Sequence, residues 1–234
     1  MSEESTDFTG YPEEEAVIYD QKRFKYPAGK AFDKFEKNQL YKLFSELEAG
    51  EKILEVGCGT GRFMADGREF GLDMTGGDMS AHMINEARQK LDREASLCVL
   101  DGTELPIQDN MFDGVYSIRT LNQLPTQDHA RSMIHEMIRV CKPGGEILVE
   151  FVNSEALFNR YRENTTYLTK EDVTSIFENK DVTVNWTSGI LFFTQTVLEA
   201  VPSFGLPAFA RIDEAFAKKF PRRATRCYIG GTVQ

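Results

Sequence analysis

The chain lacks the residues and runs that several classes of protein need. Its 234 residues include three histidines, one tryptophan and four cysteines, and no two cysteines form a C-x-x-C pair. This pattern argues against a zinc or disulfide framework, so we expect reduced thiols and no metal. No apolar run approaches the roughly 18 residues of a membrane span. The polar N-terminus is not a secretory signal, and we expect a cytoplasmic protein.

The chain also has fewer basic than acidic residues, 27 against 37. The net charge is −10, whereas a phosphate backbone attracts basic surfaces, so we expect no nucleic-acid partner. The hydrophobic fraction of 41% and the charged fraction of 27% are ordinary for a globular protein. The length allows one large α/β domain with room for an embedded subdomain.

Short apolar runs alternate with helical patterns from residue 51 onward, which predicts a parallel sheet covered by helices. The expected strands are 53–56, 73–77, 97–100, 114–117, 147–151, 182–186 and 226–232. Helices are expected at 62–70, at 127–140 and after Ser80, and also at 155–162 and 170–177. Thr169 and Asp172 are spaced as a capping box. The segment 11–48 has a mainly helical pattern with many aromatic residues.

Three closely spaced glycines follow the first strand of this sheet in "ILEVGCGTGRF". They allow a sharp turn and close approach of a ligand to the backbone, at the strand end where open α/β sheets bind ligands. No lysine follows, as a phosphate-binding P-loop requires. A dinucleotide motif would have a third glycine where Met64 stands. The glycines fit a third motif, G-x-G-x-G with an acidic residue, Glu55, two positions before the first glycine.

Four ordered blocks over residues 51–151 resemble the class I S-adenosylmethionine (SAM) dependent methyltransferases. They are "ILEVGCGTGRF", "GGDMSAHMI", "DGTELPIQDNMFDGVYS" and "EMIRVCKPGGEILV". The likeness is greatest to the ubiquinone/menaquinone-biosynthesis-like group, which acts on small molecules. It implies a Rossmann-like fold with helices on both faces of a seven-stranded, mostly parallel sheet whose last strand is antiparallel.

The resemblance also implies a set of cofactor-binding residues. Asp78 ends the second strand and would accept hydrogen bonds from both ribose hydroxyls. Met79 would lie against the adenine, and Asp101 would accept from its amino group. Tyr19 and Arg23 belong to a segment that lies over the pocket in this family. The full expected set is Tyr19, Arg23, Glu55, Gly57, Cys58, Gly59, Gly61, Asp78, Met79, Asp101, Gly102, Thr103 and Ser117.

The acceptor side is expected after the fourth strand. Many members of the family carry histidine near positions 122 and 123, where this chain has asparagine and glutamine. The candidates for catalysis are therefore Arg119 for an anionic acceptor, Asn122 for a hydrogen bond and His129 near the acceptor mouth. Glu150 is another possible base. A catalytic base is needed only where the acceptor arrives protonated.

We predict a single methyltransferase domain over 1–234. Residues 1–48 would form an N-terminal cap, 51–186 and 226–234 the SAM-binding core, and 187–225 a helical insertion over the acceptor site. The insertion begins with a stretch rich in phenylalanine and leucine. Three arginines at its end and just after it could hold a phosphate or carboxylate: Arg222, Arg223 and Arg226.

The predicted activity is transfer of a methyl group from SAM to a small organic acceptor, on an O, N or C atom. The acceptor could be anionic, isoprenoid-like or sugar-derived, and transient contact with a membrane surface is possible if it is a lipid. Three alternatives stay open: a SAM-binding regulatory or scaffold protein without catalysis, a nicotinamide-dependent oxidoreductase, and a protein methyltransferase. The last would need an open acidic groove, whereas a small-molecule enzyme would have a closed apolar pocket.

Overall fold

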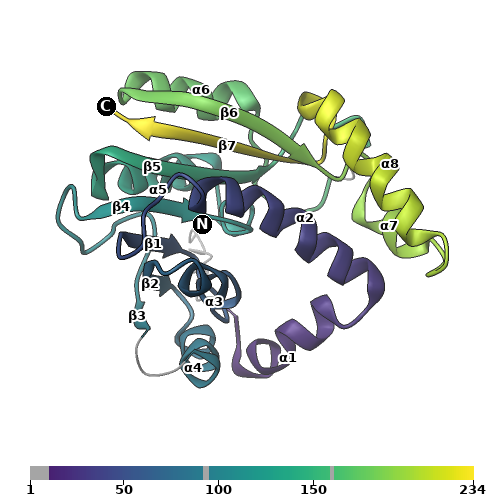
Figure 1. Cartoon of the computed structure of the whole chain (residues 1–234), viewed down its shortest axis with the longest axis horizontal. Helices are drawn as coiled ribbons and strands as arrows, with labels where there is room; N and C mark the ends of the chain where they lie inside the picture. Colours follow the sequence, from purple (N-terminus) through teal and green to yellow (C-terminus); the bar gives the residue numbers. More distant parts are fainter. Residues whose placement is uncertain (1–10, 92–94, 159–160) are drawn as a thin grey trace, which may run out of the picture.

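One mixed sheet organises the chain, for which a computed structural model describes residues 11–91, 95–158 and 161–234. The strand order across the sheet is β3-β2-β1-β4-β5-β7-β6 (Figure 1). Strands β1 to β5 are parallel, and β7 runs antiparallel to both of its neighbours. The predicted seven-stranded fold is therefore confirmed. The strands are β1 Lys52–Val56, β2 Asp73–Asp78, β3 Ser96–Val99, β4 Phe112–Ser117, β5 Cys141–Val152, β6 Val182–Ile190 and β7 Arg226–Val233.

Helices cover both faces of the sheet because each has one apolar stripe to bury. Helices α2 (Pro27–Phe44), α3 (Arg62–Glu69) and α4 (Ala81–Lys90) pack in one buried apolar cluster with the first face. Helices α5 (Gln127–Val140) and α6 (Lys170–Asn179) form the other cluster on the opposite face. Thr169 and Asp172 do form the predicted capping box of α6, and Ser80 caps α4.

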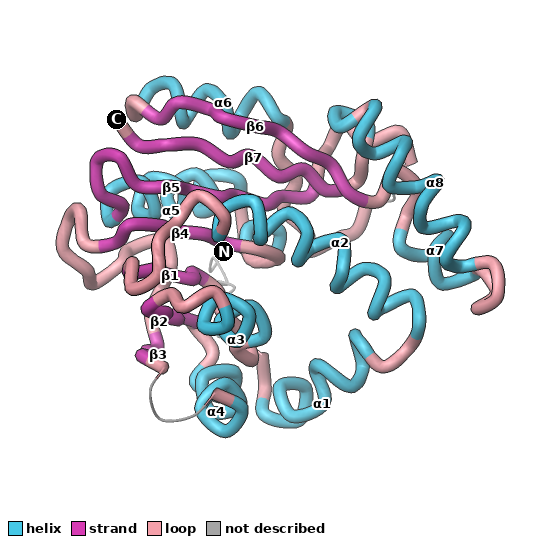
Figure 2. The backbone as a smooth tube through the Cα atoms, viewed as in Figure 1, coloured by secondary structure: helices cyan, strands magenta, loops and turns pink. Residues whose placement is uncertain are grey.

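The remaining helices gather at the end of the sheet where the parallel strands finish (Figure 2). Helix α1 (Glu13–Phe24) contacts α4 and α2. The presence of α1 and α2 confirms the helical pattern that was expected for the N-terminal segment. Helices α7 (Gln195–Ala200) and α8 (Leu206–Lys219) lie between β6 and β7 in the sequence and contact α2. Within the described residues, no helix is long and apolar enough to cross a bilayer.

Two elements differ from those expected from the sequence, the segment 155–162 and strand β5. The segment 155–162 is not helical where the structure describes it, and its residues 159–160 lie outside the described part. The cause is a tertiary one, because the amide of Leu157 donates to the carbonyl of Arg223 instead of to a helical partner. Strand β5 also starts six residues earlier than expected, at Cys141, and Lys142–Gly145 is accommodated by a register shift against β4.

Candidate active site

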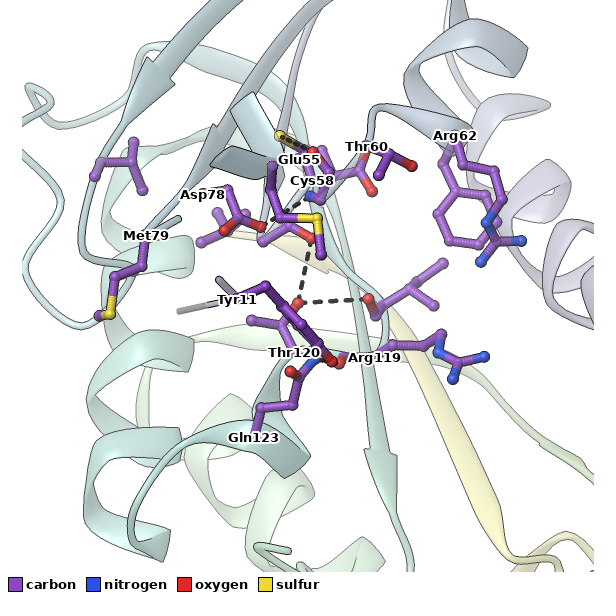
Figure 3. A pocket seen from close by; sticks show the side chains of 18 of the residues that line it. Tyr11, Glu55, Cys58, Thr60, Arg62, Asp78, Met79, Arg119, Thr120 and Gln123 are labelled. Carbon is purple, nitrogen blue, oxygen red and sulfur yellow. Dashed lines mark hydrogen bonds between the residues drawn. The ribbon is translucent and has the colours of Figure 1, made fainter. Parts of the chain in front are cut away.

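A cavity opens at the carboxyl ends of the central strands. Its lining includes the loop after β1, Asp78 and Met79 after β2, and Arg119 and Thr120 after β4 (Figure 3). The strand order reverses between β1 and β4, because β2 and β3 extend to one side and β5 to the other. Open α/β sheets bind their ligands at such a point.

The glycine loop gives this cavity a wall of bare backbone. Gly57 has φ of +81°, and a Cβ at that position would lie 2.0 Å from the Oγ1 atom of Thr120. Gly59 has φ of +53°, and a Cβ there would meet nothing within 4 Å. Gly57 is therefore required by the packing of the two loops, while Gly59 leaves open space in which a ligand can approach the main chain.

Asp78 joins the glycine loop to the end of β2. Its Oδ2 atom accepts the N–H of Gly59 at 2.8 Å, and its Oδ1 atom accepts the N–H of Ser80 at 2.8 Å. Burial raises the pKa of Asp78, and these two backbone donors lower it. A carboxylate has about four acceptor positions. Two positions therefore remain for the hydroxyl groups of a ligand in the cavity that Asp78 lines.

Glu55 lies at the base of the cavity and is 1% exposed. Its Oε2 atom accepts the hydroxyl hydrogen of Tyr116 at 2.9 Å. Burial raises the pKa of Glu55 from 4.5 to about 8, which outweighs the opposing effects of Tyr116 and Arg62. This side chain therefore keeps its proton at neutral pH. Burial also raises the pKa of the Cys58 thiol, so that cysteine is a poor nucleophile.

The structure brings most of the expected cofactor residues together around this one cavity. Those in its lining are Tyr19, Glu55, Gly57, Cys58, Gly59, Asp78, Met79 and Gly102. The others lie outside the lining: Arg23, Gly61, Asp101, Thr103 and Ser117.

Local hydrogen bonds show what some of these outlying residues do. The hydroxyl of Ser117 donates to the carbonyl of Val56 at 2.8 Å, which joins β4 to β1. The Oδ1 atom of Asp101 accepts both the amide and the hydroxyl of Thr103. Each of these bonds shapes the strand or loop that carries it. The guanidinium of Arg23 lies 5.2 Å from the centre of the Tyr19 ring and so touches the wall from outside.

The three candidates for catalysis separate in the fold. Arg119 lines the cavity, is 8% exposed, and has a left-handed φ of +67°. Asn122, on the short turn η1 (Leu121–Gln123), lines a second cavity. His129 is exposed on the first turn of α5, where its Nδ1 atom lies 2.7 Å from the hydroxyl of Thr126.

Several lining residues were not predicted from the sequence, and Tyr11 is the most informative of them. Its carbonyl accepts the hydroxyl hydrogen of Ser80 at 2.8 Å. Its ring meets that of Tyr19 edge-on, with centroids 5.4 Å apart, so the two tyrosines form one part of the cavity wall. The signal for Tyr11 was weak: it is one aromatic residue at the edge of an acidic segment. Gln123 also lines the cavity, from the position where the family often has histidine.

The chemistry of the lining fits an adenosine-bearing ligand. The free acceptor positions of Asp78 suit adjacent ribose hydroxyls. Side chains without charge form the wall next to Asp78 and suit a flat heterocycle: Met79, Met83, Leu100, Leu124 and Met133. The open face of Gly59 suits a ligand that runs along the main chain.

Comparisons with known proteins agree with this site. Residues 54–149 match a family model described as a methyltransferase domain. The chain is 32% identical over 117 residues to the methyltransferase GfsG of Streptomyces halstedii, a match that covers 47% of this chain and 41% of that relative. It is 32% identical over 124 residues to a tRNA (carboxymethyluridine(34)-5-O)-methyltransferase of Arabidopsis thaliana, with 53% and 28% covered. The chain thus spans less than half the length of these relatives.

A solved structure shows the same fold over nearly the whole chain. It is the Haemonchus contortus phosphoethanolamine N-methyltransferase 2 in complex with S-adenosyl-L-methionine, with a TM-score of 0.66 and 18% identity. The match covers 97% of this chain and 58% of that one. Residues 54–149 therefore match a methyltransferase domain, and the chain has the fold of a solved methyltransferase that binds S-adenosyl-L-methionine.

Proposed function

We propose that the chain is an enzyme that transfers the methyl group of SAM to an O, N or C atom of a small organic acceptor and releases S-adenosylhomocysteine. One observation carries the proposal. Asp78 keeps two acceptor positions in a cavity at the switch point of the sheet, inside the segment that matches a methyltransferase domain. The likeness to the ubiquinone/menaquinone-biosynthesis-like group supports a small molecule as acceptor.

Six of the lining residues have a role in this proposal. Asp78 would hold the ribose, and Met79 would lie against the adenine. Gly57 and Gly59 would allow the rest of the cofactor to run along the backbone of the loop. When bound, SAM supplies an electrophilic methyl group on its sulfonium. The remaining task of the protein is to orient the acceptor and exclude water. Tyr11 and Tyr19 would exclude water from above.

The residues of the site and the charge of the chain distinguish this proposal from the competing functions. A protein methyltransferase would need an open groove, whereas this site is a cavity with two tyrosine rings in its lining. Against a nicotinamide cofactor stands Met64, fully buried where a dinucleotide motif has its third glycine. A tRNA acceptor is the second candidate, because the Arabidopsis relative is named for one. The net charge of −10 opposes it.

The first test is calorimetric titration with SAM, S-adenosylhomocysteine and NAD in parallel. We expect both SAM compounds to bind with micromolar affinity and NAD to give no signal. Folded protein that binds neither SAM compound would overturn the proposal. A second assay follows radioactive methyl transfer from SAM to pooled small acids, alcohols and amines, and to bulk tRNA. SAM binding without transfer to any of these acceptors would favour the non-catalytic alternative.

A further inference from the structure

A second cavity lies beside the cofactor cavity. It is bounded by Val152 at the end of β5, by Arg226 at the start of β7 and by the first residues of α7. The turn η1 separates the two cavities, because Asn122 lines the second and its neighbour Gln123 lines the first. A molecule in the second cavity would therefore lie one turn away from the cofactor.

The side chains around this second cavity are polar and carry positive charge. Its described lining contains two arginines, Arg162 and Arg226, and no carboxylate. Most of the other lining residues bear hydroxyl or amide groups: Asn122, Thr165, Tyr167, Thr194, Gln195, Thr196 and Thr225. Such a lining favours an anion that also carries hydrogen-bonding groups. Of the three arginines that the sequence marked for an anion, only Arg226 lines the cavity.

A buried carboxylate fixes Arg226 in place. Glu150 is fully buried, and its Oε1 atom contacts Nη1 of Arg226. Its Oε2 atom accepts the N–H of Arg119 at 2.7 Å. The guanidinium groups of Arg119 and Arg226 lie 4.9 Å and 5.8 Å from the centre of the Phe32 ring. Glu150 thus ties the wall of the cofactor cavity to the wall of the second one.

Arg226 keeps hydrogen-bonding capacity toward the cavity. A guanidinium has five N–H donors, and among the described residues only Nη1 of Arg226 has an acceptor, the Glu150 carboxylate. The other donors are not sealed inside the protein, since the side chain is 13% exposed. Asn122 offers the complementary group, because its buried Oδ1 atom has no donor among the described residues. The cavity therefore offers donors at one end and an acceptor at η1.

We propose that this second cavity is the acceptor site, and that the acceptor is a small molecule with a carboxylate or phosphate group. Arg226 and Arg162 bind the anionic group. A hydroxyl or amino group of the same molecule donates to Asn122, and the reactive end reaches past Gln123 into the cofactor cavity. This proposal rests on the proposed function and adds the substrate class. It also gives Glu150 the role of a positioning residue for Arg226.

The test uses the full chain saturated with S-adenosylhomocysteine, titrated in a calorimeter with inorganic phosphate and with malonate. Sodium chloride at equal ionic strength is the control for general charge. We expect saturable binding of at least one of the two anions. The one that binds distinguishes a phosphate acceptor from a carboxylate acceptor. The expected loss in Arg226→Gln and in Arg162→Gln is about tenfold or more, as for a charged hydrogen bond.

Three variants make the test decisive. Arg226→Gln removes the charged partner of the buried Glu150 and could fail to fold. Arg162 is exposed, so its replacement leaves no buried charge unpaired. Arg211→Gln removes an exposed arginine of α8 that lines neither cavity, so its anion affinity should stay unchanged. If Arg226→Gln does not fold, Arg162→Gln decides the outcome.

Wild-type affinity in both cavity variants would overturn the inference, and so would an equal loss in Arg211→Gln. Absence of anion binding in protein that still binds S-adenosylhomocysteine would overturn the inference alone. Failure to bind S-adenosylhomocysteine itself would instead overturn the proposed function.

Discussion

Replacing Glu55 with glutamine should stabilise the cofactor-free protein, and increasingly so as the pH rises. Glu55 is fully buried below the glycine loop, and burial raises its pKa from 4.5 to about 8. Glutamine is nearly isosteric, and its carbonyl can still accept the hydroxyl hydrogen of Tyr116, which bonds Glu55 at 2.9 Å. The substitution therefore removes the titration while it keeps the contact.

The magnitude follows from proton linkage. The unfolded chain releases the proton of Glu55 near pH 4.5, whereas the folded chain holds it up to about pH 8. Between these values the unfolded state binds one proton fewer, so the free energy of unfolding of the wild type falls by about 1.4 kcal/mol for each pH unit of increase. The loss is about 3 kcal/mol at pH 7 and about 4 kcal/mol at pH 8, and it levels off near about 5 kcal/mol above that. Glutamine has no such loss.

Urea unfolding measures this difference directly. The chain has one tryptophan, Trp186 on β6, and its fluorescence can follow the transition at several pH values from about 5 to about 8. Glu178→Gln is the matched control, because Glu178 is exposed on the last turn of α6. A stability difference between wild type and Glu55→Gln that is the same at every pH would refute the reasoning. It would mean that Glu55 is ionised in the folded protein.

Three further substitutions test the site and its support. Asp78→Ala should weaken SAM binding by about 1–3 kcal/mol in calorimetry, since a charged acceptor is lost; Asp73→Ala, at the exposed start of the same strand, should not. Gly57→Ala should lower the free energy of unfolding by about 1–3 kcal/mol through strain and the clash with Thr120, and an unchanged urea midpoint would contradict this. Thr169→Ala should cost about 1 kcal/mol by loss of the capping box, measured in the same way.

The parts of the fold that follow from local patterns were predictable. Residues 53–56, the glycines and 62–70 were expected as strand, loop and helix, and the structure has Lys52–Val56 and Arg62–Glu69. Asp78 could be placed because one strand–helix–strand unit sets its distance from the glycines. These features depend on neighbours in the sequence, which a single sequence displays.

The parts that failed depend on residues far away in the sequence. The segment 155–162 has a helical pattern, but Asn153 donates to the carbonyls of Arg222 and Ala224, and Leu157 donates to that of Arg223. These bonds to the turn before β7 compete with a helix. Glu150 had the sequence position of a possible base, yet it is bound on both oxygens, by Arg119 and Arg226. No periodicity in the sequence reveals such pairs.

Long-range ion pairs of this kind also hold the two N-terminal helices beside the cofactor cavity. Glu36 of α2 is fully buried and meets Arg62, which follows the glycine loop, at 2.8 Å, and Arg119, which follows β4, at 3.5 Å. Lifting α2 would leave these charges unpaired at a cost of several kcal/mol. Helix α1 is held by a more exposed pair, Asp20 with Lys90, which contributes about 0–1 kcal/mol. Ion pairs therefore hold α2 to the wall of the cofactor cavity more strongly than they hold α1 to α4.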